Sequence, residues 1–490
     1  MPDCHPLLSA CQMRAAEQYM ITHGLQSYAL MQRAGEAVAA YVASYYKARK
    51  ILVLCGTGNN GGDGFILAQN LLAGGENVSI ALWGEVKSLK GDAAKAAAQY
   101  KGKVIPLAKA MLNGNPLIID ALFGAGLTRP VEGAAAQLIH KINATRLDVI
   151  AVDIPSGVQG DTGEILGVAI SAAITLTFAY KKYAHVLMPG RIMCGEVIVA
   201  DIGVSHEAIA LLGPLVQENQ PALWHGKLPW PKPEHHKYHR GHVLVIGGGM
   251  QHAGAAKLAA LAALRVGAGL VSIVCDKHDL PIYAATALSL ITETQDRWKK
   301  LLEDTRINTV LIGPGAGVNR QTRMQVLQAF KARKQMVLDA DALTSFADDP
   351  QTLFNTVTSP CIVTPHAGEF ARIFKDMRGS KIERTLQAAR MSHAVVVFKG
   401  FDTVIAAPDG RVAVNTNAPA TLATAGAGDV LSGICAGLLA QGMEAFDAAC
   451  AAAWMHGEAA KQQGEGLIAE DLPQRLPSVL HMLKIRYERH

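Results

Sequence analysis

The glycine- and asparagine-rich segment Cys55-Gly-Thr-Gly-Asn-Asn-Gly-Gly-Asp-Gly64 carries residue types that are well suited to chemistry. It follows an apolar run at 51–54 and precedes a helical pattern at 65–72. A strand, a turn and a helix N-terminus in this order present free backbone N–H groups at the positive end of the helix dipole, which suits a phosphate group. A glycine pattern alone would be weak evidence. The asparagines and the acid indicate that this turn also coordinates a second group.

Two further polar motifs follow predicted strands: Asp120-Ala-Leu-Phe-Gly-Ala-Gly-Leu-Thr-Arg-Pro130 and Asp153-Ile-Pro-Ser-Gly157. The carboxyl ends of parallel strands lie along one edge of a sheet, where ligands bind, so the three motifs predict one site. Asn60, Asp120 and Ser156 offer hard oxygen ligands for an alkali or alkaline-earth cation. Asp153 is a candidate general acid or base. Each motif alone could be an ordinary turn or helix cap, but the three together favour a functional site.

A second set of motifs lies near the C-terminus, where Thr424-Ala-Gly-Ala-Gly-Asp429 opens an apolar helical pattern at 430–440. Backbone amides at 426–428 could hold charge on a transferring phosphoryl group while Asp429 accepts the proton of a substrate hydroxyl. The alternative is a helix cap without chemistry. Other polar motifs at predicted strand ends weigh against that alternative: 313–315, 339–341, 364–369 and 398–403. Glu369 is a candidate metal-linked acid among them.

These motifs need two α/β series to position them. In the first series we expect a helical lead-in at 10–48, helices near 63–73, 88–100 and 132–143, and strands at 51–54, 78–82, 117–120, 149–153, 174–178 and 196–200. This alternation predicts a parallel sheet with helices on both faces. In the second series we expect strands at 242–246, 270–275, 309–312, 336–339, 361–364, 395–398 and 403–406. Residues 213–233 hold five prolines and two tryptophans, which indicates a seam between domains.

Composition excludes several classes of protein. The chain has 490 residues, so more than one domain is expected; 50% of them are hydrophobic and 18% charged, and the net charge is +5. Lysine and arginine are scattered, so no nucleic-acid partner is expected. No apolar window is long enough for a membrane span and no leader pattern begins the chain, so a cytoplasmic location is expected. The eight cysteines contain no C-x-x-C pair, which favours buried reduced thiols. We expect no metal at His235, His236, His239 and His242, because they lack a ligand pattern.

The motifs of the first series resemble those of the NAD(P)H-hydrate epimerase family, over about residues 10–210. The resemblance implies that the pyridine nucleotide hydrate is held by Asn59, Asn60, Gly61, Gly62, Asp63, Gly124, Ala125, Gly126, Leu127, Thr128, Arg129 and Pro130. It also implies a potassium ion on Asn60, Asp120 and Ser156, and a catalytic contact between Asp153 and the altered nicotinamide ring. Ala125 departs from the pattern, because many relatives carry threonine there.

The second series resembles the ribokinase-like fold and, within it, the NAD(P)H-hydrate dehydratase family, over about residues 220–485. The shared signatures include G-H-V-L-V-I-G-G at 241–248, L-D-A-D-A-L at 338–343, T-P-H-x-G-E at 364–369 and A-G-x-G-D at 425–429. The resemblance implies that Ala255, Gly315, His366 and the catalytic Asp429 contact the hydrate. It places the adenine nucleotide on Lys399, Gly400, Phe401, Asp402, Thr403 and Gly428. The segment 417–419, Asn-Ala-Pro, departs from the glycine-asparagine pair of some relatives.

We therefore expect an α/β protein with two domains: a Rossmann-like three-layer unit at 1–215, a linker at 216–235 and a ribokinase-like three-layer unit at 236–490. The first would epimerise the R and S hydrates of NADH or NADPH. The second would dehydrate the S form at the expense of ADP or ATP, with Mg²⁺. The alternative is a small-molecule kinase fused to a non-catalytic nucleotide- or RNA-binding domain. A homo-oligomer is expected. The sequence does not decide between ADP and ATP or between NADH and NADPH, nor whether intermediates pass between the sites.

Overall fold

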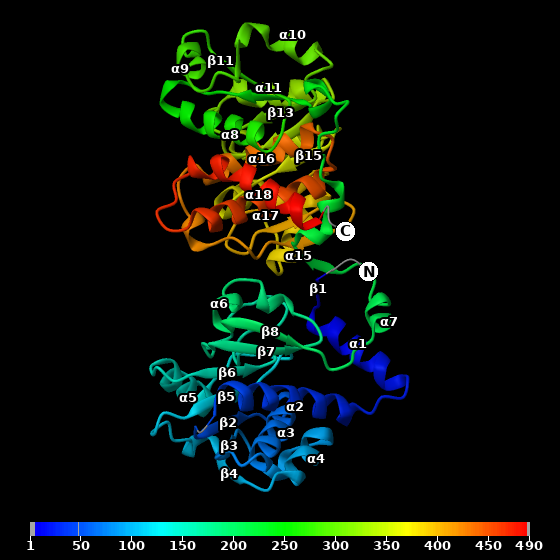
Figure 1. Cartoon of the computed structure of the whole chain (residues 1–490), viewed down its shortest axis with the longest axis vertical. Coiled ribbons are helices and arrows are strands. Elements are labelled where there is room, and N and C mark those ends of the chain that lie inside the picture. Colours follow the sequence, from blue (N-terminus) through cyan, green and yellow to red (C-terminus); the bar gives the residue numbers. More distant parts are fainter. Residues whose placement is uncertain (1–4, 48, 488–490) are drawn as a thin grey trace. The chain divides into compact units, whose positions relative to one another are not determined.

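The computed structural model describes residues 5–47 and 49–487. The chain divides into two compact units, Pro6–Leu215 and a second unit that begins at Val216 (Figure 1). Both units are α/β with largely parallel sheets, which confirms the predicted fold class.

The first unit is built around a parallel sheet in the order β4-β3-β2-β5-β6-β7-β8. Its strands are β1 (Pro6–Leu7), outside this sheet, β2 (Ile51–Cys55), β3 (Val78–Leu82), β4 (Lys103–Pro106), β5 (Leu117–Ala121), β6 (Val149–Val152), β7 (Ile174–Phe178) and β8 (Glu196–Ala200). Its helices are α1 (Ala10–Thr22), α2 (Ser27–Tyr45), α3 (Asn59–Ala73), α4 (Gly91–Gln99), α5 (Gly133–Asn143), α6 (Gly190–Cys194) and α7 (His206–Ala210). The strand order reverses between β2 and β5, which is where doubly wound folds bind ligands.

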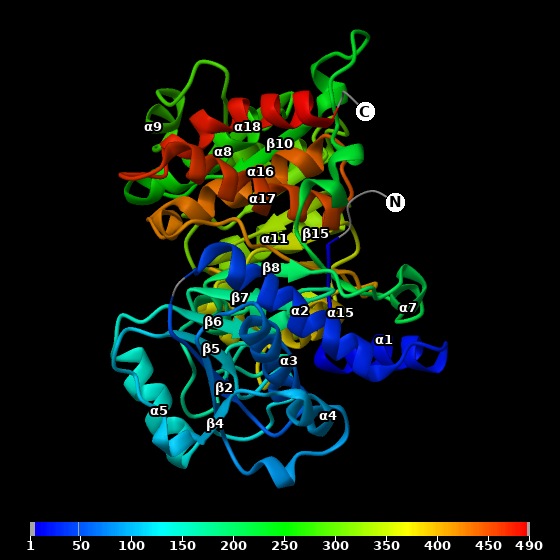
Figure 2. The same cartoon turned by 60° about the horizontal axis from the view of Figure 1, so that its bottom comes forward.

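Both faces of this sheet are buried, and this explains the continuous apolar strands in the sequence. Successive side chains of a strand point to opposite faces. In β2, Ile51 and Val53 pack with α2, α3 and α4, whereas Leu52 and Leu54 pack with α5. Figure 2 shows α2, α3 and α4 on one face of the sheet and α5 on the other. The sheet is therefore fixed between two helical layers, and its carboxyl edge is left to carry the polar motifs.

The second unit has a sheet in the order β9-β18-β17-β16-β15-β14-β13-β10-β11-β12. Its strands are β9 (Val216–Glu218), β10 (His242–Ile246), β11 (Leu270–Cys275), β12 (Ile291–Thr294), β13 (Thr309–Ile312), β14 (Gln335–Leu338), β15 (Cys361–Val363), β16 (Val395–Phe398), β17 (Val404–Ala406) and β18 (Val412–Val414). Its helices are α8 (Ala253–Arg265), α9 (Leu280–Ala284), α10 (Trp298–Glu303), α11 (Arg320–Lys331), α12 (Ala340–Thr344), α13 (Pro350–Phe354), α14 (Ala367–Ile373), α15 (Lys381–Ser392), α16 (Ala427–Ala440), α17 (Ala445–Gln463) and α18 (Asp471–Tyr487).

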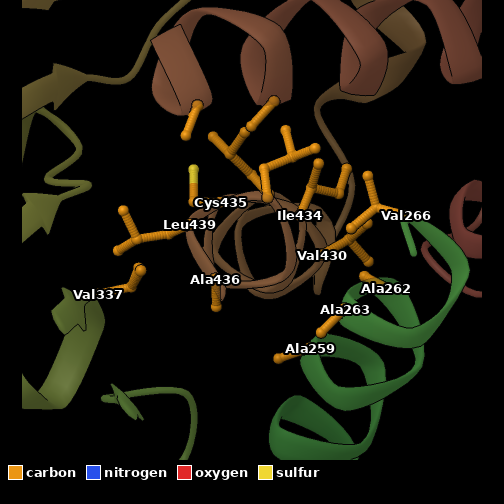
Figure 3. Packing of buried hydrophobic residues seen from close by; sticks show 14 of the residues in the cluster. Ala259, Ala262, Ala263, Val266, Val337, Val430, Ile434, Cys435, Ala436 and Leu439 are labelled. Atoms are coloured by element: carbon orange, nitrogen blue, oxygen red, sulfur yellow. The ribbon is translucent and has the colours of Figure 1, made fainter. Parts of the chain in front are cut away.

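Helix α16 is the centre of the second core. Figure 3 shows it end-on, with alanines of α8 on one side and Val337 of β14 on another. A Cβ built on Gly433 would overlap the carbonyl oxygen of Ala259 in α8, so only glycine permits this close approach. Small residues therefore fix the axis of α16, and with it the position of its N-terminus.

Several elements differ from the predictions. The lead-in is two helices, α1 and α2, rather than one, because Gly24 lies between them with φ of 99°. Residues 59–63, predicted as a turn, form the first turns of α3. The sequence missed the short strands β4, β9, β12 and β18. Strand β17 begins at Val404 and runs antiparallel to β16.

Residues 216–235, expected as a linker, pack on the second unit. Strand β9 pairs with β18 in parallel. The Trp224 side chain is buried in the same core, and its Nε1 donates a hydrogen bond to Asn219 Oδ1 at 3.1 Å. Asn219 in turn donates to Asn415 Oδ1 and to the carbonyl of Cys450, both at 2.8 Å. The proline-rich segment 216–235 is therefore largely irregular in secondary structure, but its packing holds it in place.

The described cysteines are free thiols. Six are buried, as expected, but Cys11 on α1 is exposed, so the expectation of burial is wrong for it; Cys4 lies outside the described residues. No helix among the described residues is long and apolar enough to cross a membrane.

Candidate active sites

A cavity of about 920 Å³ opens at the carboxyl edge of the first sheet. Its lining includes these predicted residues: Asn59, Asn60, Asp63, Gly124, Ala125, Gly126, Leu127, Thr128, Arg129, Pro130 and Asp153. The three motifs, which are far apart in sequence, therefore meet in one place. Gly61 and Gly62 are buried in α3 next to this lining.

The N-terminus of α3 reaches the cavity because glycines allow close packing. A Cβ built on Gly61 would overlap the carbonyl oxygen of Gly56, and one on Gly56 would overlap that of Leu122. These contacts draw the ends of β2 and β5 and the first turn of α3 together. The free amides and the positive end of the α3 dipole favour an anionic ligand here.

A buried oxygen cluster joins β5 to the turn after β6. Asp120 is fully buried; its Oδ1 accepts from Ser156 Oγ at 2.6 Å and its Oδ2 from the Ser156 amide at 2.7 Å. Burial raises the pKa of Asp120 to about 6, although these hydrogen bonds act in the opposite direction. Both polar atoms of the Asn60 side-chain amide are buried without a hydrogen-bond partner among the described residues. This unpaired carbonyl oxygen and the Asp120 carboxylate, which has no cationic partner in the part of the chain that the structure describes, fit an alkali cation.

Asp153 is held in a defined position by four contacts. Its φ is 66°, and its Oδ1 accepts from Lys182 Nζ at 2.8 Å and from Thr177 Oγ1 at 3.0 Å. Its Oδ2 lies 3.4 Å from the Ala125 amide, and its carbonyl oxygen lies 2.8 Å from Nε2 of His185. Burial raises the pKa of Asp153, but Lys182, His185 and Thr177 outweigh it, so the pKa lies below the usual range. Asp153 is therefore ionised at neutral pH.

Two more acids face the same cavity. Glu17 of α1 lines it together with Asp63 of α3, and Lys182, which pairs with Asp153, acts electrostatically on both. Burial raises the pKa of Glu17, and Asp153 adds to this, whereas Lys182 and Arg14 lower it. Burial, Asp153 and Glu17 raise the pKa of Asp63 well above its usual range, against the effect of Lys182. Glu17 and Lys182 could not be assigned from the sequence, because neither lies in a glycine-rich motif.

In the second unit the polar motifs follow five neighbouring parallel strands. Gly247 follows β10, Gly313 follows β13, Asp339 follows β14, Thr364 follows β15 and Lys399 follows β16. The turns after β10 and β13 touch, because a Cβ built on Gly248 would overlap the carbonyl oxygen of Gly315. These loops thus form one edge, as predicted for a parallel sheet.

The N-terminus of α16 meets an ion pair at this edge. Its cap, Gly426, has a φ of 87°, and Asp429 lies in its first turn. Lys399 Nζ lies 2.7 Å from Asp339 Oδ1 and 4.0 Å from Glu369 Oε2. A Cβ built on Gly428 would lie 3.4 Å from Lys399 Nζ, so the amides of α16 and the lysine are neighbours.

The environment of Asp429 suits proton transfer. Burial and the carboxylates of Asp339, Asp341 and Glu369 raise the pKa of Asp429 to about 6, whereas Lys399 lowers it. A carboxyl group with a pKa near the working pH can both take and return a proton. The first turn of α16 therefore offers a base beside amides that can hold phosphoryl charge.

The remaining predicted residues have different surroundings. The exposed His366 caps α14: its Nδ1 accepts from the Gly368 amide at 3.0 Å, and Glu369 Oε2 accepts from the His366 amide at 2.9 Å. Ala255 lies near the start of α8, and Gly315 has a φ of 66°.

Residues 399–403, which were predicted to bind the nucleotide, differ in their exposure to solvent. Gly400 and Phe401 are exposed. Asp402 is buried, and its Oδ1 lies 2.6 Å from Lys381 Nζ. Thr403 Oγ1 donates to the Gly400 carbonyl at 2.7 Å, which closes the turn. Asp339 and Lys381 were not assigned from the sequence; the Asp339 motif was noted, but its ion pair with Lys399 joins residues 60 positions apart.

The fold and both sites define a two-unit α/β protein with a polar site at the carboxyl edge of each sheet. The chain belongs to the family of bifunctional NAD(P)H-hydrate repair enzymes. A curated relative of that name from Moorella thermoacetica is 36% identical, over 97% of this chain and 95% of its own. Another from Escherichia coli is 33% identical, over 94% of this chain and 90% of its own.

Two family models match the chain, one within each of the two units. The model described as NAD(P)H-hydrate dehydratase matches residues 243–481, and the model for the N-terminus of YjeF-related proteins matches residues 27–184. Among solved structures, an ADP/ATP-dependent NAD(P)H-hydrate dehydratase from Bacillus subtilis, co-crystallised with ATP and Mg²⁺, is 29% identical. It covers 53% of this chain and 95% of its own, with a TM-score of 0.48.

Proposed function

We propose that the first unit interconverts the R and S hydrates of NADH and NADPH and that the second unit dehydrates the S form at the expense of ADP or ATP. In this proposal residues 1–215 carry the epimerase and residues 236–490 the dehydratase, with residues 216–235 packed on the dehydratase unit. The observation that carries it is the convergence of three distant motifs on one cavity in a unit that has its own core.

The first cavity would bind the hydrate through its phosphates and its altered ring. The α3 amides and Arg129 face the cavity and suit the phosphates, whereas Asp153 suits the ring. Asn60, Asp120 and Ser156 would hold potassium, which supplies a fixed positive charge beside the bound phosphates. The unpaired Asn60 amide supports this ligand set.

In the second unit Asp429 would accept the proton of the hydrate hydroxyl while the α16 amides stabilise the transferring phosphoryl group. Phosphate is a better leaving group than hydroxide, so its loss with a ring proton restores the double bond. Mg²⁺ would neutralise nucleotide phosphate charge. Among the described residues no group of three or more histidine, cysteine or acidic side chains is placed to hold a metal. This fits an ion bound mainly by phosphates and water, with Glu369 nearby.

The test is to incubate the purified protein with the S hydrate of NADH and either ADP or ATP. The proposal predicts that absorbance at the NADH band returns and that one phosphate is released per NADH. A stable phosphorylated product without NADH would favour a small-molecule kinase instead.

The proposal includes a cytoplasmic location and a homo-oligomeric state. The free thiols are compatible with a reducing compartment. Light scattering of the purified protein tests the oligomeric state, and a single-chain mass would contradict it.

A further inference from the structure

Three acidic side chains that line the first cavity interact electrostatically with Lys182. Glu17 comes from α1, Asp63 from α3 and Asp153 from the turn after β6, and all three line the cavity with Lys182. Glu17 lies outside every motif of this unit, on a helix that no glycine-rich turn positions. Its role therefore has to be inferred from its surroundings.

Lys182 forms an ion pair with Asp153 and hydrogen bonds to the end of β7. Its Nζ lies 2.8 Å from Asp153 Oδ1, donates to Thr177 Oγ1 at 2.8 Å and donates to the Phe178 carbonyl at 3.0 Å. Its side chain is 3% exposed, compared with 16% for Asp153. Lys182 is already paired with Asp153, and burial outweighs the effect of Lys182 and Arg14 on Glu17 and that of Lys182 on Asp63, so both carboxyl groups favour the protonated form.

We propose that Glu17 is a proton donor of the epimerase site and acts opposite Asp153 as the acceptor. This inference rests on the proposed epimerase function of the first unit. It places one proton-transfer group on α1 and the other after β6, with the hydrate between them in the cavity.

The protonation states of the three acids support these roles. Asp153 has a lowered pKa and Glu17 a raised one, and pairs whose pKa values are pushed apart mark acid and base roles. The pKa of Asp63 is raised much further, so Asp63 keeps its proton. A proton donor must hold its proton before the reaction begins, and the raised pKa of Glu17 favours that form. The charged groups that act on Glu17 are Lys182, Asp153, Asp63 and Arg14.

The reaction balances without a further reagent. In the hydrate, C6 of the nicotinamide ring carries the added hydroxyl group and is bonded to the ring nitrogen N1. This hydroxyl gives its proton to Asp153, its O–H electron pair forms a carbonyl at C6, and the C6–N1 bond breaks. The bonding pair passes to N1, which takes a proton from Glu17. Rotation about C5–C6 exposes the other face of the carbonyl. Ring closure then reverses each transfer, so both carboxyl groups return to their starting states and only the configuration at C6 changes.

The test uses the whole chain, the R hydrate and no nucleotide, so that only epimerisation takes place, and chromatography measures the S product. Glu17→Gln keeps the shape but cannot transfer a proton, so kcat should fall by ~10²–10⁴-fold with KM little changed. Wild-type kcat should fall as pH rises through the raised pKa of Glu17, because the donor form is lost. This limb should be absent in Glu17→Gln, and Glu17→Asp should restore part of the rate.

Glu36→Gln is the matched control, because Glu36 is exposed on α2 and does not line the cavity. It replaces an acid by its amide in the same way and should leave kcat unchanged. Wild-type kcat in Glu17→Gln, or a pH limb that persists unaltered in Glu17→Gln, would overturn the role of Glu17. Absence of epimerisation in the wild type would instead refute the proposed function. Circular dichroism and retained dehydratase activity would show that each variant is folded.

Discussion

At the scale of single residues, opposite pKa shifts distinguish two aspartates. Asp153 is ionised because Lys182 compensates for its burial. Burial and neighbouring carboxylates instead raise the pKa of Asp429 to about 6, against the effect of Lys399. A base that is already ionised and a base whose pKa lies near the working pH suit different reactions. This agrees with one site for epimerisation and another for phosphoryl transfer.

Asp429→Asn tests the proposed base of the second unit. The variant keeps the shape but removes the base, so dehydration of the S hydrate should fall by ~10²–10⁴-fold. In the wild type kcat should fall as pH falls through about 6, because the ionised form accepts the proton. Stopped-flow absorbance at the NADH band measures both effects.

Asp348→Asn serves as the control, since the Asp348 side chain is 78% exposed and pairs only with Arg323 among the described residues. It should not change kcat. Near-normal turnover by Asp429→Asn would contradict the assignment. A loss of nucleotide affinity alone would make Asp429 a binding residue.

Asp120→Asn tests the cation site. Removal of the charge beside Asn60 and Ser156 should abolish the potassium dependence of epimerisation and weaken hydrate binding. The ionised carboxylate binds the cation, so wild-type potassium affinity should fall as pH falls through about 6. Titration of epimerase rate with KCl, at constant ionic strength with choline chloride, measures this. An unchanged potassium dependence in the variant would rule out this ligand set.

The sequence predicted individual site residues best where a motif holds them. Asn60, Asp120, Asp153 and Ser156 were all found in this way, and the structure brings them to one edge of the sheet. Glu17 and Lys182 were missed because their proximity depends on how α1 and the end of β7 pack, which no local pattern encodes.

At the scale of elements, the first turn of α3 shows where local propensity fails. Two glycines and two asparagines predict a turn at 59–62, since each disfavours a helix interior. The structure is helical from Asn59, because Gly61 and Gly64 allow the helix to lie against Gly56 and against Cys55 and Ala121. Tertiary packing thus outweighs the intrinsic preference.

Gly61→Ala should therefore destabilise the first unit. Its Cβ would overlap the Gly56 carbonyl oxygen, which belongs to the backbone and cannot move as a side chain does. We expect a loss of ~1–3 kcal/mol in free energy of unfolding and weaker hydrate binding, measured by urea denaturation and by KM. Gly74→Ala, at the other end of α3 with φ of −74° and no close contact, is the control. Equal stability of the two variants would show that the close approach is unimportant.

At the scale of the whole molecule, the sequence predicted two α/β halves because the alternation of strands and helices is regular in each. It did not predict that residues 216–235 would be part of the second core. Prolines interrupt regular structure after β9, but the burial of Trp224 depends on its ring contact with the distant Trp454. It also depends on Asn219, which is itself bonded to the carbonyl of Cys450.

Two fragments of the second unit test this. A fragment that begins at Val216 should fold and keep dehydratase activity, and the fragment 1–215 should keep epimerase activity. A fragment that begins at 236 lacks β9 and Trp224, so it should be less stable by at least ~3 kcal/mol, by analogy with the removal of a buried tryptophan. Thermal denaturation measures the difference. Equal stability of the fragments from 216 and 236 would show that the segment is a linker after all.

The assignment of one reaction to each unit is tested most directly with a mixture of the R and S hydrates of NADH. One protein preparation is given this mixture with nucleotide in excess, and the return of NADH is followed. The wild type should restore NADH from both epimers. Asp153→Asn should restore only the fraction that is S at the start, at the wild-type rate, and Asp429→Asn should restore almost none. If Asp153→Asn restored both epimers as fast as the wild type, or if Asp429→Asn restored NADH normally, the assignment of one reaction to each unit would be contradicted.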